Sequence, residues 1–217
     1  MAEVQQISLS IVIAVDGPAA SGKGTIARAL ASHFGLPHMD TGLLYRAVAL
    51  NLWRWGGDPS SEFEALRACA QMDFSLDDPE LRSEPVSKIA SAVSAYPSVR
   101  AALLDRQREF AHQQGGAVLD GRDIGSVVAP DADVKLFVTA CPEVRAHRRV
   151  RELLERGMSA HYEDVLADIR SRDERDSNRE TAPLKQAEDA LLLDTSELDI
   201  EEAKAEAVRL VREKVGA

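Results

Sequence analysis

The stretch Leu9-Ser10-Ile11-Val12-Ile13-Ala14-Val15-Asp16, followed by Gly17-Pro18-Ala19-Ala20-Ser21-Gly22-Lys23-Gly24-Thr25 and by residues 26–34, predicts a strand, a loop and a helix in that order. The first run is short and rich in β-branched residues, which is typical of a strand buried on both faces. Ile26, Leu30 and Phe34 recur every four residues and define one face of a helix. The chain is therefore predicted to have an α/β fold.

The loop between this strand and this helix has the spacing G-x-x-x-x-G-K. Such a loop lets backbone N–H groups cradle a phosphate at a helix N-terminus, and the lysine reaches the terminal phosphates. We expect Gly17 to Thr25 to bind nucleotide phosphates. A hydroxyl residue usually follows the lysine, but here Gly24 follows it and Thr25 comes one position later. We therefore expect Mg²⁺ to be held through phosphates and waters, with no direct protein ligand.

Length and charge limit the remaining possibilities. The 217 residues, 45% of them hydrophobic, can bury one full core, so residues 1–217 are predicted to form a single domain. The net charge of -10 argues against a nucleic-acid polymer as partner and favours small substrates. Cys69 and Cys141 lack metal or redox spacing, and are expected to be reduced. Without a predicted leader or membrane span, we expect a cytoplasmic monomer.

Beyond the first helix, Asp40-Thr41-Gly42 opens a second helix that carries Tyr45 and Arg46. Capping of the helix is the alternative role for Asp40 and Thr41. After the break at residues 56–59 we expect an insertion made of a helix from 61 to 71, a short strand from 72 to 76 and a polar turn from 77 to 85. Two helices follow the insertion, one from 87 to 95 and one from 99 to 113.

A buried-type strand at residues 117–120 ends in Asp120-Gly121-Arg122-Asp123. Ligands of an open parallel sheet bind at the carboxyl ends of the strands, so this tetrad is expected beside the phosphate loop. Asp120 could orient Mg²⁺ through water, although a simple polar turn is the alternative interpretation.

Most of the 26 basic residues are arginine, and many fall in two predicted helices, one from Pro142 to Gly157 and one from Tyr162 to Arg175. The planar guanidinium suits phosphate oxygens. Two such helices between a strand at 134–138 and a strand at 191–194 are typical of a lid over phosphates. A solvated helix face, paired with the acidic residues of the same segment, is the alternative. A helix from Ile200 to Val215 closes the chain.

The chain resembles the bacterial cytidylate kinase family in the order and spacing of several motifs: the loop at 17–25, Asp40-Thr41-Gly42-x-x-Tyr45-Arg46, Ser91, Tyr96-Pro97-x-Val99-Arg100, the tetrad at 120–123, and Arg172-Asp173-x-Arg175-Asp176-x-Asn178-Arg179. The resemblance implies a P-loop NTPase fold with a five-stranded parallel sheet flanked by helices. It implies a core of residues 7–40, 99–141 and 180–217, a monophosphate-binding region at 41–98 and a lid at 142–179. It also implies phosphorylation of CMP and dCMP by ATP with Mg²⁺.

The same resemblance assigns roles residue by residue. Arg46, Arg122 and Arg179 would hold the acceptor phosphate, while Tyr45, Arg172 and Asp176 would face the sugar. Ser91, Arg100 and Asp123 would bind cytosine, with Asp40 and Thr41 beside the acceptor. The catalytic residues would be Lys23, Arg122, Arg172 and Arg175.

Two other functions share part of this pattern. A GTP-hydrolysing switch has the same loop, but the chain lacks the Asn-Lys-x-Asp guanine signature. Another small-molecule kinase would share loop and lid without Ser91, Arg100 and Asp123. The chain departs from many bacterial relatives in the short insertion at 58–84.

Overall fold

The computed structural model describes residues 10–71 and 78–216. The described residues divide into two compact units, one formed within 1–39 and 111–217 and the other within 40–110. Residues 142–179, which are predicted to form a lid, fall in the first unit together with the phosphate loop.

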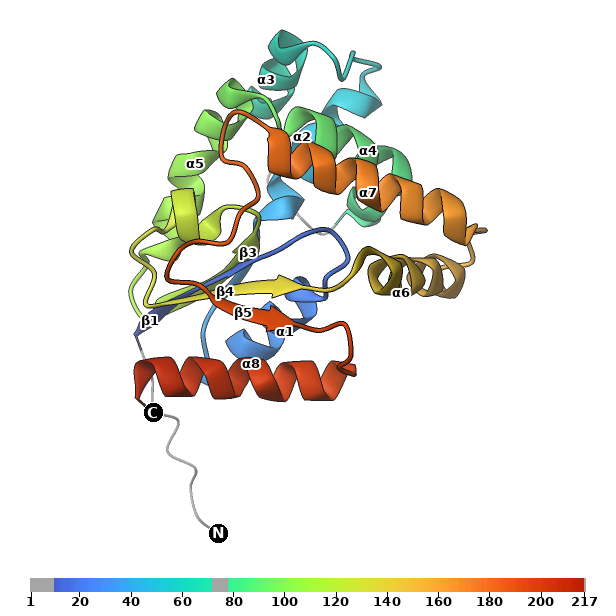
Figure 1. Cartoon of the computed structure of the whole chain (residues 1–217). Coiled ribbons are helices and arrows are strands. Elements are labelled where there is room, and N and C mark those ends of the chain that lie inside the picture. Colours follow the sequence, from blue (N-terminus) through green and yellow to red (C-terminus); the bar gives the residue numbers. More distant parts are fainter. Residues whose placement is uncertain (1–9, 72–77, 217) are drawn as a thin grey trace. The chain divides into compact units, whose positions relative to one another are not determined.

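The first unit is built on a five-stranded sheet in the order β2-β3-β1-β4-β5, and Figure 1 labels β1, β3, β4 and β5. The strands are β1 Ile11–Asp16, β2 His38–Asp40, β3 Gly116–Gly121, β4 Val134–Thr139 and β5 Leu191–Asp194. The strand β1 pairs in parallel with β3 on one side and with β4 on the other, and β4 pairs in parallel with β5. The predicted P-loop kinase fold is thereby confirmed, with the strand before the loop at the centre of the sheet.

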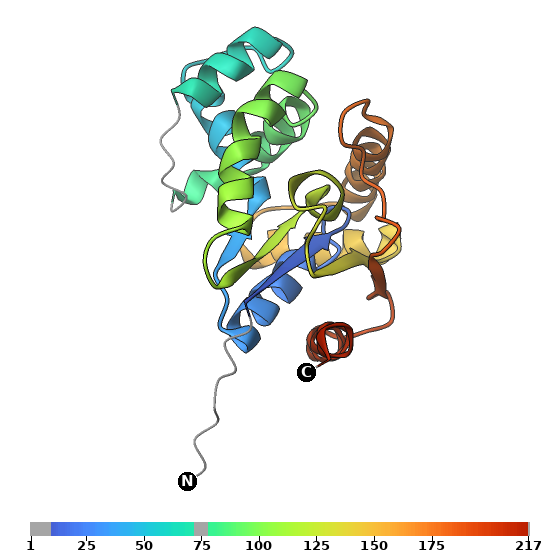
Figure 2. The ribbon, with the colours of Figure 1, turned by 90° about the vertical axis from the view of Figure 1, so that its left-hand side faces the viewer.

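The helices α1 (Lys23–Phe34) and α8 (Ile200–Val215) lie on the same side of this sheet, as both ribbon views show (Figures 1 and 2). Their apolar positions form one core cluster with the strands, which includes Ile13, Leu30, Val118, Leu136 and Ala207. Each large aliphatic side chain buried in this way contributes roughly 1.5–3 kcal/mol. Gly35 ends α1 in a left-handed conformation, which a glycine adopts without a steric penalty.

Three further elements follow β3 and β4 in the first unit. A short π-helical turn spans Ile124–Val128 directly after the tetrad. The helix α6 (Pro142–Glu155) begins with Pro142 in its first turn, and it packs on α7 (Tyr162–Asn178). The exposed Cys141 immediately precedes α6, whereas Cys69 in the other unit is buried.

The second unit is helical. It contains α2 (Thr41–Arg54), α3 (Glu62–Ala70), a 3₁₀ turn (Pro79–Arg82), α4 (Glu84–Val93) and α5 (Pro97–Ala111). The Ser61 side chain caps α3 by accepting a bond from the Glu64 N–H, and Asn51 Nδ2 of α2 donates to the carbonyl of Ala68 at 2.8 Å.

Two boundaries in this unit differ from the sequence prediction. The helix expected from residue 87 begins at Glu84, because Pro85 occupies its first turn, where the missing N–H costs nothing. Likewise, Pro97 is the first residue of α5 and was expected to lie between helices. The strand predicted at 72–76 lies outside the described residues.

The turn into β3 yields a stability prediction. Gly115 and Gly116 both have positive φ, at 94° and 84°, but a Cβ on Gly116 would lie 2.2 Å from the Ile11 carbonyl oxygen, while one on Gly115 would meet nothing within 4 Å. We expect Gly115→Ala to lower the free energy of unfolding by about 1–2 kcal/mol, the usual cost of a left-handed L-residue. Gly116→Ala should cost clearly more, because β1 must move. Urea denaturation of both variants measures the difference, and equal losses would contradict the steric argument.

Candidate active site

Where it leaves β1, the phosphate loop lies directly against the neighbouring strand β4. Gly17 has a φ of 152°, and a Cβ on it would lie 2.0 Å from the carbonyl oxygen of Val138 in β4. No other residue fits there without moving β4. Ala20 adopts a left-handed φ of 58°, which is uncommon for a residue other than glycine. The loop therefore turns sharply before α1 begins at Lys23.

The start of α1 has the properties of an anion site. Its N-cap residue is Gly22, which has no side chain that could cap the helix, and the first turn of the helix contains no acidic residue. The first N–H groups of a helix lack intrahelical partners and carry partial positive charge. Lys23 Nζ lies 3.4 Å from the Pro18 carbonyl oxygen, so its ammonium group is held over the loop. A phosphate group would match both the helix end and the lysine.

Asp16, the last residue of β1, is a buried carboxylate that sequence reasoning did not single out. Its Oδ1 accepts a hydrogen bond from the Ile124 N–H at 2.8 Å, and its Oδ2 accepts one from the Gly125 N–H at 2.8 Å. Burial raises the pKa of Asp16 to about 6, against the lowering effect of these two hydrogen bonds. Asp16 thus connects the strand before the loop with the turn after the tetrad.

Asp120 ends up beside the start of α1, as its position in the tetrad predicts. Its side chain is almost completely buried, and its Oδ1 lies 2.8 Å from Nε2 of His38 in β2. Its Oδ2 lies 3.6 Å from where a Cβ on Gly24 would be. His38 carried no signal in the sequence, because it is a lone histidine before a helix start.

The donor set near the loop suits Mg²⁺ held largely through phosphates and water. Within residues 10–71 and 78–216, no group of three or more His, Cys, Asp or Glu side chains could hold a metal ion. The hydroxyl of Thr25 accepts a hydrogen bond from Arg28 at 3.3 Å. Mg²⁺ prefers oxygen ligands and keeps several waters, so one carboxylate, Asp120, fits such an ion.

The residues after β3 meet those at the end of α7. Arg122 Nε donates to Oδ2 of Asp176 at 2.8 Å, and Arg179 Nη2 lies 3.7 Å from Oδ1 of Asp123. All four side chains are at most one-sixth exposed. The structure therefore brings together two pairs that are 54 and 56 positions apart in the chain.

The electrostatics of this cluster favour an anion. Burial raises the pKa of Asp176, but the charges of Arg122, Arg172 and Arg179 and the hydrogen bond from Arg122 outweigh it, and the net pKa lies below its ordinary value. Three guanidinium groups thus act on Asp176, with Asp123 as the second carboxylate of the cluster. Arg175, also predicted to be catalytic, lies exposed on α7.

A buried arginine connects the phosphate loop to α6 and α7. Arg145 of α6 is 3% exposed. Its Nη1 and Nη2 donate to the two carboxylate oxygens of Asp173 in α7, at 3.0 and 2.5 Å. Nη1 also donates to the Ala19 carbonyl at 3.2 Å, and Nε donates to the Ala140 carbonyl at 2.8 Å. Ala20 packs beside this contact against an apolar cluster that includes Leu166 and Ile169. The start of α6 and the Asp173 region of α7 are therefore held at the phosphate loop.

A second arginine of α6 connects it to the end of β5. Arg148 donates to the hydroxyl and the carbonyl of Thr195, at 2.9 and 2.6 Å. The Thr195 hydroxyl in turn lies 3.2 Å from the carbonyl oxygen of Ser21 and 3.0 Å from that of Thr139, and its one proton is shared between these two acceptors. The arginine-rich sequence predicted phosphate contacts or a solvated face, but it could not reveal that Arg145 and Arg148 hold the loop backbone.

The second unit carries the other predicted substrate residues. Thr41, Tyr45, Ser91 and Arg100 are all buried. The guanidinium of Arg100 lies over the Tyr45 ring, 5.6 Å from its centroid, and its Nη1 donates to the Ser94 carbonyl at 3.2 Å.

Near the start of α2 the contacts are different. Asp40 occupies the N-cap position of α2, as the alternative interpretation predicts, but its side chain makes no capping bond. Arg46 Nη1 donates to the carbonyl of Leu81 at 2.9 Å. These assignments to a substrate remain predictions.

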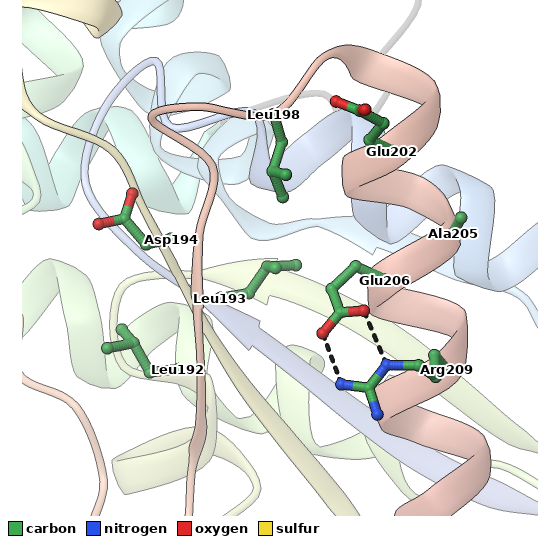
Figure 3. Close-up of a pocket in the computed structure, with 8 residues that line it drawn as sticks. All are labelled: Leu192, Leu193, Asp194, Leu198, Glu202, Ala205, Glu206 and Arg209. Atoms are coloured by element: carbon green, nitrogen blue, oxygen red, sulfur yellow. Dashed lines mark hydrogen bonds and ion pairs between the residues drawn. The ribbon is translucent and has the colours of Figure 1, made fainter.

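An open cavity of about 550 Å³ lies between β5 and α8, and none of the predicted site residues lines it (Figure 3). Leucines and three carboxylates, Asp194, Glu202 and Glu206, line it, and Arg209 pairs with Glu206 there. This acidic lining disfavours a nucleotide phosphate, so we do not assign the nucleotide to this cavity.

Comparison with known proteins identifies the family. A family model described as cytidylate kinase matches residues 13–213. The chain belongs to the cytidylate kinase family. It is 59% identical to a cytidylate kinase of Xanthobacter autotrophicus, over 93% of this chain and 97% of that protein. It is 57% identical to a cytidylate kinase of Methylocella silvestris, over 93% of this chain and 94% of that one.

Among solved structures, an uncharacterized protein from Eubacterium ventriosum matches this cytidylate kinase family member with a TM-score of 0.54 and 12% identity, over 92% of this chain and 96% of the other. At that identity the match supports the fold alone. None of the helices within residues 10–71 and 78–216 is long and apolar enough to cross a membrane.

The raised pKa of Asp16 leads to a pH prediction. Its pKa is about 6 in the folded protein, against an ordinary value of 3.8 for an aspartate side chain, so the folded state binds a proton more tightly. The stabilisation is present at low pH and is lost as the pH rises through about 6. Between pH 7 and pH 4, the unfolding free energy of the wild type should rise by about 2 kcal/mol relative to Asp16→Asn, which does not titrate. Urea denaturation at several pH values measures this, and a constant difference would contradict it.

Proposed function

We propose that the protein transfers the terminal phosphoryl group of ATP to CMP and dCMP, yielding CDP or dCDP and ADP. The observation that supports this most directly is the family match over residues 13–213, which contains both the loop and the arginine cluster. Phosphoryl transfer needs little covalent chemistry from the protein and depends on positioning and charge neutralisation. A helix end without a cap, a lysine and several arginines supply those requirements.

For the donor, we assign the ATP phosphates to residues 17–25. The first N–H groups of α1 would donate to phosphate oxygens, and Lys23 would neutralise charge on the terminal groups. Mg²⁺, when bound, would offset the charge of the phosphates, and Asp120 would hold one of its waters. The His38 contact fixes the orientation of Asp120 for that role.

For the acceptor, we assign the phosphate to Arg46, Arg122 and Arg179. In the described structure Arg122 and Arg179 already contact carboxylates of the same cluster. A dianionic phosphate would compete for these guanidinium groups and would be bound in bidentate fashion. Tyr45, Arg172 and Asp176 are assigned to the sugar, with Asp40 and Thr41 beside the acceptor. Arg172 and Arg175 would stabilise the transferred group.

The lid proposal rests on α6 and α7. Their bases are attached to the loop by Arg145, so closure would move their outer parts over the phosphates and exclude water.

We further propose that the enzyme acts as a monomer in the cytoplasm. One assay tests the reaction directly: release of ADP with ATP and each nucleoside monophosphate in turn. Activity highest with a nucleotide other than CMP or dCMP would overturn the proposal.

The role of Lys23 gives a catalytic prediction. Lys23→Ala should leave the fold intact and lower kcat by about a hundredfold or more, the scale of losing one preorganised charge contact. Lys204→Ala, which removes a lysine paired with Glu201 on the exposed side of α8, is the matched control and should retain activity. Steady-state kinetics and circular dichroism are the measurements. Wild-type turnover in Lys23→Ala would refute the assignment.

Base selection gives a second prediction. Cytosine offers an amino donor at N4 and acceptors at N3 and O2, so a carboxylate should meet N4 and an arginine N3 and O2. Uracil has an acceptor oxygen at C4, where cytosine has its amino group, and it has an N–H at N3, where cytosine has an acceptor. A site built from buried polar groups rejects such an analogue by up to about 10⁴-fold.

Arg100→Met and Asp123→Ala should therefore lower kcat/KM for CMP much more than for UMP. The preference for CMP, measured as the ratio of the two kcat/KM values, should fall in both variants. Arg209→Met, on the exposed side of α8, is the control and should leave the ratio unchanged. If both variants lose the two substrates in equal proportion, these residues position phosphate or metal and the assignment to cytosine is wrong.

A further inference from the structure

We propose that Asp16 is a positioning residue for the acceptor: its carboxylate caps the turn after the tetrad, and so fixes Arg122 and Asp123 for substrate binding. This inference rests on the proposed function. Asp16 belongs to neither the phosphate loop nor the tetrad, and it contacts the turn from the neighbouring strand.

The geometry of the cap is specific. The turn Ile124–Val128 has Asp123 at its N-cap position, yet the Asp123 side chain makes no capping bond. The N–H groups of Ile124 and Gly125 instead donate to Asp16 at 2.8 Å each, one to each carboxylate oxygen. Since buried N–H groups need acceptors, the turn depends on a carboxylate supplied by β1.

The sheet register explains how Asp16 reaches the turn. Asp16 is aligned with Gly121 across the parallel pair β1 and β3. The chain after Gly121 must therefore fold back over the end of β1 to place residues 124 and 125 on the carboxylate. Arg122 and Asp123 lie between these two fixed points, so their backbone positions are determined from both sides.

Because Asp16 caps the turn, the Asp123 carboxylate is not used as a cap and faces Arg179. It lies 3.7 Å from Arg179, which was assigned to the acceptor phosphate, while Arg122 contacts Asp176. Loss of the cap would release the segment that carries both side chains. The phosphate loop should be affected less, because its shape is set by the approach of Gly17 to β4.

Asp16→Asn tests the inference. Asparagine has the same shape, but it presents an NH₂ group to one of the two N–H donors, so one bond is lost and the turn is pushed away. We expect faster amide exchange at Ile124 and Gly125. We also expect CMP to bind about 10- to 100-fold more weakly, the effect of losing one hydrogen bond to a charged group. A non-hydrolysable ATP analogue should bind within about threefold of wild type, a change well below the size of that bond.

Asp133→Asn is the matched control. Asp133 also accepts a hydrogen bond from a backbone N–H of β1, that of Val12 at 2.8 Å, but it does so at the opposite end of the strand. It should change neither ligand's affinity. Calorimetry with CMP alone and with the analogue alone separates the two sites, and the CMP to UMP ratio of kcat/KM provides a kinetic readout that a loss of stability alone would not change.

The outcomes are distinguishable. Equal weakening of CMP and the analogue would overturn the inference, because Asp16 would then act through the loop. Faster exchange with unchanged CMP binding would also overturn it. If the wild type neither binds nor phosphorylates CMP, the proposed function fails, whereas unchanged exchange at residues 124 and 125 refutes the cap alone. If Asp16→Asn does not fold, the test uses the wild type alone. CMP should then slow amide hydrogen exchange at Ile124 and Gly125 more than at Val12, and equal slowing would overturn the inference.

Discussion

The architecture of the first unit depends on how the chain leaves β1. At Gly17 the backbone passes so close to the Val138 carbonyl that no side chain can be accommodated, and the loop is forced to turn there. That turn directs the start of α1 back over the end of the sheet. It also leaves the Asp16 carboxylate, one residue earlier, facing the turn after β3. A single steric constraint between two adjacent strands thus orients the helix end and the buried carboxylate together.

Much of this fold could be predicted from the sequence, because its signals are local. The β-branched run, the glycine spacing and the four-residue recurrence of Ile26, Leu30 and Phe34 depend on near neighbours only. The boundary at Glu84 was missed for a related reason: Pro85 was interpreted as a turn residue, although a first helical turn tolerates proline equally well. Local rules fail where one residue type serves two local structures.

The parts of the candidate site that could not be predicted all depend on the register between distant segments. Asp16 reaches residues 124 and 125 only because β1 and β3 pair with one particular alignment. His38 meets Asp120 across 82 positions, and Arg145 meets Asp173 and Ala19 at once. An arginine-rich helix gives no hint of which guanidinium groups hold backbone carbonyls and which remain for phosphate. The division follows from burial, which composition does not specify.

The contrast between the two cysteines has a practical consequence. Burial raises the pKa of the Cys69 thiol, which reduces the thiolate fraction that reacts with electrophiles, whereas Cys141 is exposed immediately before α6. A maleimide dye should therefore label the unmodified chain at one position, at the root of the arginine-rich helices. Fluorescence from that position would report whether the surroundings of the start of α6 change when nucleotides bind, without any engineered attachment site.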